Sequence, residues 1–541
     1  MEAEGLVSAV ADPGEHVFAA LRNLPSARAS LTTVRDGQLV TVPLSDLLYP
    51  VIAMRWLLRA KGLRSGDRVG VLGENSYDWI VLDLACLAEG LVVVGFDPVH
   101  PEITLELATQ LRLAVLFTDQ EELLDAAPFV LRLRVPSSHE LSGVDPLPKW
   151  EPHRYEKDDV VAIKFTSGSV NLPKAIAATR KSIDSSIGEV QRLFRHDSRD
   201  NVLVFLPLHI LQQRYWLYSA LAFGFNLTVV APHQALGAIG SERPTVIMGV
   251  PEFFEQVAVR LRADIAATQM QRVDLDAYRA LRKLPLVSRL VGPYGAAQRH
   301  LGGRVRYLWT GSAPMRRETI DLYESAGIPL YQGYGTNETC IVAKNYPGNN
   351  RIGSVGKVLP NKAVVIEDDG HILVKSHHEV ARCYLLASEE ENSQTFLADG
   401  TVATGDLGYV DEDGYLFITG RRKELLVLPS GRKIHPSIIE DRIRAVAGVR
   451  NCMVTTAPGR SGVCAVIDAE DAATRASIID GVSRETSDLP PDARVLGAVL
   501  VPEHFSRENG LLTSQYKLRR AAIAERYARE IAKMFEDSFA Q

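Results

Sequence analysis

Three consecutive runs decide the fold class: Arg68-Val-Gly-Val-Leu72, Trp79-Ile-Val-Leu-Asp-Leu-Ala-Cys-Leu-Ala88 and Leu91-Val-Val-Val-Gly-Phe96. The first and third are short and apolar, as buried strands are, whereas the second has the length and spacing of a helix. A strand, a helix and a strand in this order predict parallel strands joined by a crossover helix. Similar strands, each followed by a helical segment, recur later in the chain, at residues 202–206, 227–230 and 246–250. We therefore predict an α/β fold with mixed or parallel sheets flanked by helices.

The length of the chain and a change in its pattern of expected strands and turns predict more than one domain. Its 541 residues exceed the roughly 250–300 at which a single hydrophobic core stops growing. After Gly353, short strands alternate with Asp-Gly turns, so we expect a β-rich subdomain, 353–420, within a large N-terminal domain, 1–420. The polar junction 421–423 is the expected hinge, and 424–541 are predicted to form a small α+β C-terminal domain.

Composition argues against several classes of protein. The net charge of −6 and the pI of about 6.2 are not those of a nucleic-acid binder, which usually carries a basic patch. The first residues lack a basic region, and the apolar stretch Ile80–Phe96 contains Asp83 and Glu89, so we expect neither a signal peptide nor a membrane span. Five cysteines without metal-ligand spacing indicate a cytoplasmic protein, and a homodimer is the default expectation.

The segment between Phe165 and Lys174 is the first candidate for a binding site. Ser167, Gly168 and Ser169 are small enough for backbone N–H groups to approach a phosphate closely, and Lys174 adds positive charge. The spacing of a Walker loop is absent, and a purely structural Ser/Gly-rich turn is the alternative.

Two further segments combine turns with chemically useful side chains. In Tyr331–Glu338, the Tyr334 ring beside Gly335 can stack on a purine, and the Glu338 carboxylate can hold Mg²⁺. In Ala403-Thr-Gly-Asp406, the carboxylate can accept hydrogen bonds from both hydroxyls of a ribose. A glycine bend at a strand end and a simple turn are the respective structural alternatives.

A lysine near the C-terminus is the last candidate. Lys517 lies in Gly510–Arg520, just before a charged helical segment. On a mobile domain, such a lysine can swing toward a reacting phosphate. The first turn of an ordinary basic helix would give the same sequence pattern, and this is the structural alternative.

In this order, these segments resemble the adenylate-forming superfamily of acyl-CoA synthetases, adenylation domains and luciferases, and most closely the long-chain acyl-CoA synthetases. Supporting motifs include Phe205-Leu-Pro-Leu-His209, Thr310-Gly-Ser-Ala-Pro314 and Ile418-Thr-Gly-Arg-Arg-Lys-Glu424, and the resemblance extends over nearly the whole chain. It implies a reaction in two steps. A carboxylate first attacks ATP, giving acyl-AMP and pyrophosphate, and after rotation of the small domain a thiol attacks the acyl-AMP. The implied ligands are a small carboxylic acid, ATP or AMP, Mg²⁺ and CoA.

The resemblance also implies a role for each matching residue. Glu338 would bind Mg²⁺, and Lys517 would bridge the carboxylate and the α-phosphate, stabilising charge in the transition state. His209 would lie between the acyl pocket and the pantetheine tunnel, and Gly431 would face that tunnel once the small domain turns about Lys423. The residues expected to hold ATP or AMP are Ser167, Gly168, Ser169, Lys174, Gly311, Ser312, Ala313, Pro314, Tyr334, Gly335, Asn337, Asp406 and Arg421.

The phosphate loop departs from the family pattern T-S-G-T-T-G-x-P-K-G. Val170 replaces the second threonine, Asn171 the central glycine and Ala175 the last one, and Asn337 replaces the threonine of Y-G-x-T-E. Losses of about 2 kcal/mol each at Val170 and Asn337 would slow adenylation roughly a thousandfold. The contacts to AMP remain, so one of two hypotheses of equal standing is an enzyme that is poor at adenylation yet competent at thioesterification of an acyl-AMP supplied by a separate adenylating enzyme. A complete two-step reaction is the alternative, because Lys517 belongs to adenylation.

Two other functions stay open: an acyl-AMP ligase that loads a carrier protein, and a non-catalytic relative that binds an acid or a nucleotide. Ligases that load carriers usually contain an insertion, which is not evident in 353–420, so CoA is favoured. The acid is predicted to be apolar, because the segments expected to line its pocket offer Tyr215, Trp216, Phe253 and Trp309. These aromatic residues are equally suited to a core.

Overall fold

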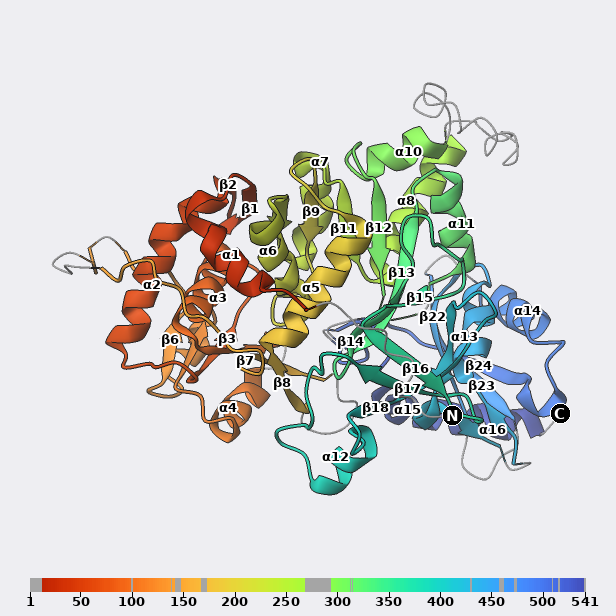
Figure 1. Ribbon diagram of the computed structural model, residues 1–541. Helices are drawn as coiled ribbons and strands as arrows, with labels where there is room; N and C mark the ends of the chain where they lie inside the picture. The colour runs from red at the N-terminus through yellow and green to blue at the C-terminus, as the bar shows by residue number, and fades with distance from the viewer. Residues whose placement is uncertain are drawn as a thin grey trace.

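The structure is a computed structural model that describes residues 12–98, 101–137, 139–141, 147–166, 173–267, 293–311, 313, 315–428, 431–456, 462–470, 474–507, 509–513 and 516–539. Within these residues the chain forms five β-sheets flanked by helices. Figure 1 shows the two largest sheets in the red-to-green part of the chain, with the C-terminal part, in blue, lying against the green strands. The predicted α/β fold class is therefore confirmed.

The six-stranded sheet contains the two strands at the start of the predicted α/β pattern. Its order is β6-β5-β3-β4-β7-β8, and neighbouring strands are parallel except for the antiparallel pair β7 and β8. The crossover helix α3 (Tyr77–Glu89) begins at Ser76, whose hydroxyl accepts the Trp79 N–H at 3.3 Å, and ends at Gly90 with a φ of 73°. The strands are β3 (Arg68–Leu72), β4 (Val92–Phe96), β5 (Val115–Thr118), β6 (Val130–Arg132), β7 (Val160–Phe165) and β8 (Ala175–Thr179).

The nine-stranded sheet has a parallel centre and antiparallel edges. Its order is β15-β14-β13-β12-β11-β9-β10-β1-β2, and the six strands from β13 to β1 are parallel. In parallel sheets, ligands bind at the carboxyl ends of the strands, which here carry Gly311 and Tyr334. The strands are β1 (Ser30–Arg35), β2 (Gln38–Pro43), β9 (Asn201–Val204), β10 (Asn226–Val229), β11 (Val246–Gly249), β12 (Tyr307–Thr310), β13 (Leu330–Thr336), β14 (Cys340–Lys344) and β15 (Lys357–Val358).

Helices cover these sheets, and α3 contacts strands of both. A buried ion pair fixes α3 to α6: Asp83 accepts Arg214 Nη1 at 2.8 Å and the Tyr218 hydroxyl at 2.7 Å. The helices of this region are α1 (His16–Asn23), α2 (Leu48–Ala60), α3, α4 (Pro101–Gln110), α5 (Arg180–Phe194), α6 (Leu211–Phe223), α7 (Ala235–Glu242), α8 (Pro251–Ala267), α10 (Pro293–His300) and α11 (Arg317–Ser325).

The rest of the chain forms smaller units. An antiparallel sheet of four strands, β16-β17-β18-β19, follows the nine-stranded sheet, and a three-stranded sheet, β22-β23-β24, has its own apolar cores. Arg316 Nη2 donates to Val449 O at 3.2 Å and Arg450 O at 2.9 Å, tying this C-terminal part to the preceding sheets. The elements are β16 (Lys362–Ile366), β17 (His371–Ser376), α12 (Glu389–Thr395), β18 (Thr401–Val410), β19 (Leu416–Arg421), β20 (Leu426–Val427), β21 (Lys433–Ile434), α13 (Pro436–Arg444), β22 (Val449–Thr455), β23 (Val463–Ala469), α14 (Arg475–Glu485), β24 (Val495–Leu500), α15 (Arg520–Arg526) and α16 (Ala528–Phe539). Among the described residues, no helix is both long and apolar enough to cross a membrane.

Candidate active site

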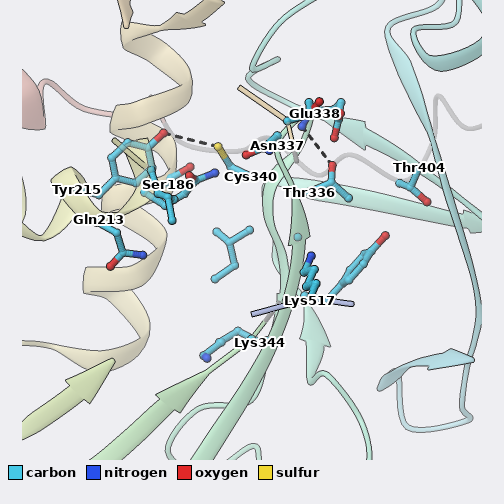
Figure 2. Close-up of a pocket in the computed structure, with 18 of the residues that line it drawn as sticks. Ser186, Gln213, Tyr215, Thr336, Asn337, Glu338, Cys340, Lys344, Thr404 and Lys517 are labelled. Carbon is cyan, nitrogen blue, oxygen red and sulfur yellow. Dashed lines mark hydrogen bonds between the residues drawn. The ribbon is translucent and has the colours of Figure 1, made fainter. Parts of the chain in front are cut away.

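A cavity of about 810 Å³ gathers residues that lie far apart in the sequence. It is bordered by α5 and α6 on one side and by β13, β14 and the segment around Lys517 on the other (Figure 2). The cavity is lined by several of the residues singled out in the sequence: Lys174, Gly311, Tyr334, Gly335, Asn337, Glu338, Arg421, Lys423 and Lys517.

The segments predicted to bind purine and ribose meet through Asp406. The Tyr334 hydroxyl donates to Asp406 Oδ2 at 2.7 Å, and Arg421 Nε lies 2.9 Å from Asp406 Oδ1. The second contact follows from strand register, because Asp406 on β18 pairs with Arg421 on β19. Asp406 is buried. The burial of Tyr334, together with the negative charge of the Asp406 carboxylate, raises the pKa of Tyr334. Tyr334 and Arg421 thus line the cavity, and both contact the Asp406 carboxylate, which is not itself among the lining residues.

Glu338 and Asn337 lie in the turn between β13 and β14. Glu338 Oε1 accepts the Tyr384 hydroxyl at 2.7 Å, and Asn337 Nδ2 donates to Phe165 O at 3.1 Å. Within the described residues, no cluster of three or more His, Cys, Asp or Glu side chains could hold a metal by itself. The Glu338 carboxylate lines the cavity and is suited to Mg²⁺, because this ion is commonly held by one or two carboxylates together with substrate phosphates.

The candidate phosphate loop connects β7 to β8. The Thr166 N–H donates to Lys174 O at 2.9 Å, and both residues line the cavity. Lys174 Nζ lies 3.3 Å from Glu391 Oε1 and 4.7 Å from the centre of the Tyr384 ring. Ser167, Gly168, Ser169, Val170 and Asn171 lie outside the described residues, as do Ser312 and Pro314 of the predicted adenine segment.

Lys517 reaches the cavity from the C-terminal part of the chain. Its N–H donates to Thr513 Oγ1 at 3.1 Å, and its carbonyl accepts the Thr513 N–H at 2.8 Å. Burial, reinforced by the Arg421 guanidinium, lowers the pKa of Lys517 to about 8. Figure 2 shows the side chain in the middle of the view, between the strand that carries Lys344 and the residues around Thr404.

His209 and Gly431 are not among the residues that line this cavity. His209 is half-buried against β4, and a Cβ at Gly95 would come within 2.7 Å of His209 Cα. Burial lowers the pKa of His209 to about 4. Gly431, with a φ of 79°, closes a turn by donating its N–H to Leu428 O at 2.8 Å. The structure therefore does not bring these two residues together with the others.

The part of the cavity that is lined by the segments expected to hold the acid is less apolar than the sequence suggested. Tyr215, Trp216 and Trp309 line it as predicted, whereas Phe253 is absent from the lining and packs against Phe205 with ring centres 4.4 Å apart. Several polar residues in the lining belong to no recognised motif: Ser186, Gln213, Cys340, Lys344 and Tyr384.

Lys344 is the most unusual of these polar residues. It is fully buried, and its Nζ donates to Tyr331 O at 2.8 Å and Thr310 O at 3.3 Å. The same atom lies 3.7 Å from the centre of the Trp309 ring, and burial lowers the pKa of Lys344 well below its usual value. The only signal in the sequence is a lysine at the end of the otherwise uncharged strand β14.

Comparisons with known proteins agree with this arrangement. A sequence profile described as AMP-binding enzyme matches residues 52–385, and one described as AMP-binding enzyme C-terminal domain matches residues 423–538. The long-chain-fatty-acid–CoA ligase FadD15 of Mycobacterium tuberculosis is 28% identical over 92% of this chain and 93% of its own length. The peroxisomal long chain acyl-CoA synthetase 7 of Arabidopsis thaliana is 24% identical over 88% of this chain and 79% of its own length.

Solved structures share the fold. ATP-bound MatB from Rhodopseudomonas palustris superposes with a TM-score of 0.76, at 22% identity, over 96% of this chain and 99% of its own. MenE from Bacillus subtilis, an o-succinylbenzoate CoA synthetase in complex with its acyl-adenylate, gives 0.73 at 19% identity, over 94% of this chain and 97% of its own. Because the AMP-binding profile spans more than half of the sequence, this chain belongs to the AMP-binding enzyme family.

Proposed function

We propose that this enzyme converts a carboxylic acid, ATP and CoA into an acyl-CoA by way of an acyl-AMP. The observation that carries the proposal is a single cavity lined by Tyr334, Arg421, Glu338 and Lys517. The Asp406 carboxylate contacts the first two of these residues. A carboxylate is a poor acyl donor, whereas AMP is a good leaving group, so activation through an adenylate suits thioester formation.

Each wall of the cavity then has a role in holding the nucleotide. The Tyr334 ring stacks on adenine beside the backbone of Gly311 and Ala313, while Asp406 accepts the ribose hydroxyls with Arg421 beside it. A carboxylate has about four acceptor positions, so Asp406 can keep its contacts to Tyr334 and Arg421 while it binds ribose. Lys174 lies at the phosphate end of the site.

Lys517 is the residue proposed to act on the transition state of adenylation. Its ammonium group balances the negative charge that gathers on the α-phosphate as the carboxylate attacks. With a pKa of about 8 in the free enzyme, most Lys517 is protonated at neutral pH. Anionic ATP and acid add negative charge beside it, which favours the protonated form further.

Mg²⁺ would be held by Glu338 together with phosphate oxygens. When bound, the ion neutralises phosphate charge and polarises the reacting phosphoryl group. The Tyr384 hydroxyl donates a hydrogen bond to Glu338 Oε1 at 2.7 Å, which orients the carboxylate.

The second step requires the C-terminal part to turn. We propose a large domain, 1–420, with 353–420 as its β-rich subdomain, a hinge at 421–423 that includes Lys423, and a mobile domain, 424–541. The separate apolar cores of the last segment support this division. Rotation would withdraw Lys517 and bring Gly431 toward a pantetheine tunnel beside His209.

A second candidate is an enzyme that works mainly in thioesterification. Asn337 takes the place of the family's threonine, and its Nδ2 donates a hydrogen bond to Phe165 O. Lys174 forms an ion pair with Glu391. Neither donor is then fully available to ATP phosphates. Such an enzyme would receive its acyl-AMP from a separate adenylating enzyme, and its acceptor would be CoA or the pantetheine of a carrier protein.

Two half-reaction assays test the proposal over a panel of fatty, aromatic and polycyclic acids. Pyrophosphate release from ATP measures adenylation, and conversion of synthetic acyl-AMP to acyl-CoA without ATP measures thioesterification. The full function predicts both, and the second candidate predicts only the latter. Lys517→Ala is the matched control, because it should abolish pyrophosphate release and leave thioesterification intact. Binding of AMP without turnover in either assay would refute both candidates.

A further inference from the structure

One arginine side chain joins the two parts of the chain that the proposed rotation must separate. Arg316 stands directly before α11, and its Nη2 donates to Val449 O at 3.2 Å and to Arg450 O at 2.9 Å. Both carbonyls belong to β22, the first strand of the C-terminal sheet. In Figure 1 the green helix α11 lies beside the blue C-terminal part of the chain. The contact therefore crosses the boundary between the two proposed domains.

The C-terminal strand is shaped for this contact. The pairing of β22 with β23 shifts between Val449 and Asn451, which makes Arg450 the extra residue of a β-bulge. A bulge leaves its extra residue outside the hydrogen-bond ladder of the sheet. The Arg450 carbonyl is therefore available to a donor from another element, and Arg316 supplies that donor.

Arg316 is itself held in place by the large domain. Its N–H donates to Glu255 Oε1 at 3.2 Å, and the Thr319 hydroxyl donates to Glu255 Oε2 at 2.5 Å. Burial raises the pKa of Glu255 on α8 and of Asp441 on α13, and the positive charge of Arg316 opposes both shifts. The guanidinium thus lies near a carboxyl group of each domain. Because its side chain makes no capping hydrogen bond to α11, the helix does not need it in order to begin.

The position that Arg316 fixes is also the one that places Lys517 at the cavity. Tyr516, the neighbour of Lys517, packs against an apolar core of the large domain and against one of the C-terminal part. Apolar contacts have little directional preference, whereas hydrogen bonds weaken steeply when their geometry changes. A rotation of the C-terminal part would break both hydrogen bonds of Arg316 and withdraw Lys517 in the same movement.

We propose that Arg316 is a positioning residue for adenylation, which holds the C-terminal domain where Lys517 lines the cavity and must be released before CoA reacts. The inference rests on the proposed function, because it assumes a rotation between the two half-reactions. Without the Arg316 side chain, a larger fraction of molecules should occupy the rotated position. CoA reacts only in that position, so its apparent affinity should rise with this fraction.

The test compares Arg316→Ala with Arg317→Ala, which removes the neighbouring guanidinium and leaves the contact intact. Arg317 is 64% exposed and pairs within its own helix, with Asp321 at 3.1 Å. With synthetic decanoyl-AMP, 3-phenylpropanoyl-AMP and cholanoyl-AMP as acyl donors, Arg316→Ala should lower the KM for CoA roughly three- to tenfold without accelerating pyrophosphate release from ATP. Arg317→Ala should match the wild-type protein, and Arg316→Lys, which keeps a charged donor, should lie between the two.

Tryptic cleavage at the exposed hinge residues 421–423 gives a second readout, which needs no substrate. Each alanine variant lacks one tryptic site, so the two can be compared directly, and Arg316→Ala should be cut at the hinge roughly threefold faster or more. Equal cleavage of the two variants, or an unchanged KM for CoA in an active protein, would overturn the inference. An equal loss of both half-reactions in Arg316→Ala would also overturn it, because a general loss of structure would then explain the effect. If the wild-type protein catalysed neither half-reaction while Arg316→Ala was still cut faster, the proposed function alone would fall.

Discussion

Replacing Asp406 by asparagine should weaken AMP binding strongly while leaving the fold intact. The carboxylate is 3% exposed, accepts the Tyr334 hydroxyl at 2.7 Å and faces Arg421 at 2.9 Å, so it is held firmly where ribose is proposed to bind. A hydrogen bond to a charged group is worth about 1.5–3 kcal/mol. The amide keeps one acceptor oxygen, so about one ribose contact is lost, which corresponds to a roughly ten- to hundredfold weaker Kd.

Isothermal titration of AMP into the Asp406→Asn variant measures this loss, with circular dichroism to check the fold. Asp411→Asn is the matched control, because Asp411 follows the same strand and is also paired with an arginine, but its partner Arg351 does not line the cavity, whereas Tyr334 and Arg421 do. It should change the Kd less than about twofold, since partly exposed ion pairs contribute little. Wild-type affinity in Asp406→Asn would refute the ribose assignment, and an equal loss in both variants would indicate a general disturbance of the sheet.

Three further predictions concern the pH profile, the altered phosphate site and the packing. Because Lys517 must be protonated, kcat/KM for pyrophosphate release should fall as pH rises through about 8, and Lys517→Met should abolish the release at every pH. The combined changes Val170→Thr and Asn337→Thr should accelerate adenylation, up to roughly a thousandfold, without changing thioesterification rates, and an unaltered rate would exclude the loop as the cause of slow adenylation. Gly95→Ala should lower the free energy of unfolding, measured by urea titration, by about 1–3 kcal/mol, because the new Cβ would meet the His209 backbone. Gly237 lies in a helix with open space around it, so Gly237→Ala should raise the free energy of unfolding by about 0.4–1 kcal/mol in the same titration.

The parts of the site that the sequence predicts are those fixed by local geometry. Strand ends and Asp-Gly turns identify the segments, and once β18 and β19 pair in register, Asp406 must face Arg421. Tyr334 is predictable as a site residue because it lies near the carboxyl end of a parallel strand, where ligands generally bind. The α/β architecture is predictable for the same reason, because apolar runs of strand length alternate with helical periodicity.

The parts that the sequence does not predict depend on contacts between distant elements. Helical spacing does not reveal which face of α6 borders a cavity, so Gln213 resembles any polar residue beside Arg214. Lys344 ends a short apolar strand, and only the tertiary structure shows that its amino group contacts two carbonyls and the Trp309 ring. The sequence predicts Phe253 beside the acid, but its ring packs on Phe205 at the edge of a core that includes residues of α8 and β11.

The Asp83–Arg214–Tyr218 contact has a consequence for the evolution and engineering of this enzyme. Arg214 and Tyr218 stand one helical turn apart and hold α6 to α3, whereas Tyr215 and Ser219, also one turn apart, border the cavity. Removing one partner of a buried ion pair costs about 3–5 kcal/mol, so the anchoring side of the helix tolerates little change. The neighbouring side, which borders the cavity, can be substituted one residue at a time without rotating the helix. New acid specificities can therefore arise on α6 while its packing against α3 stays unchanged.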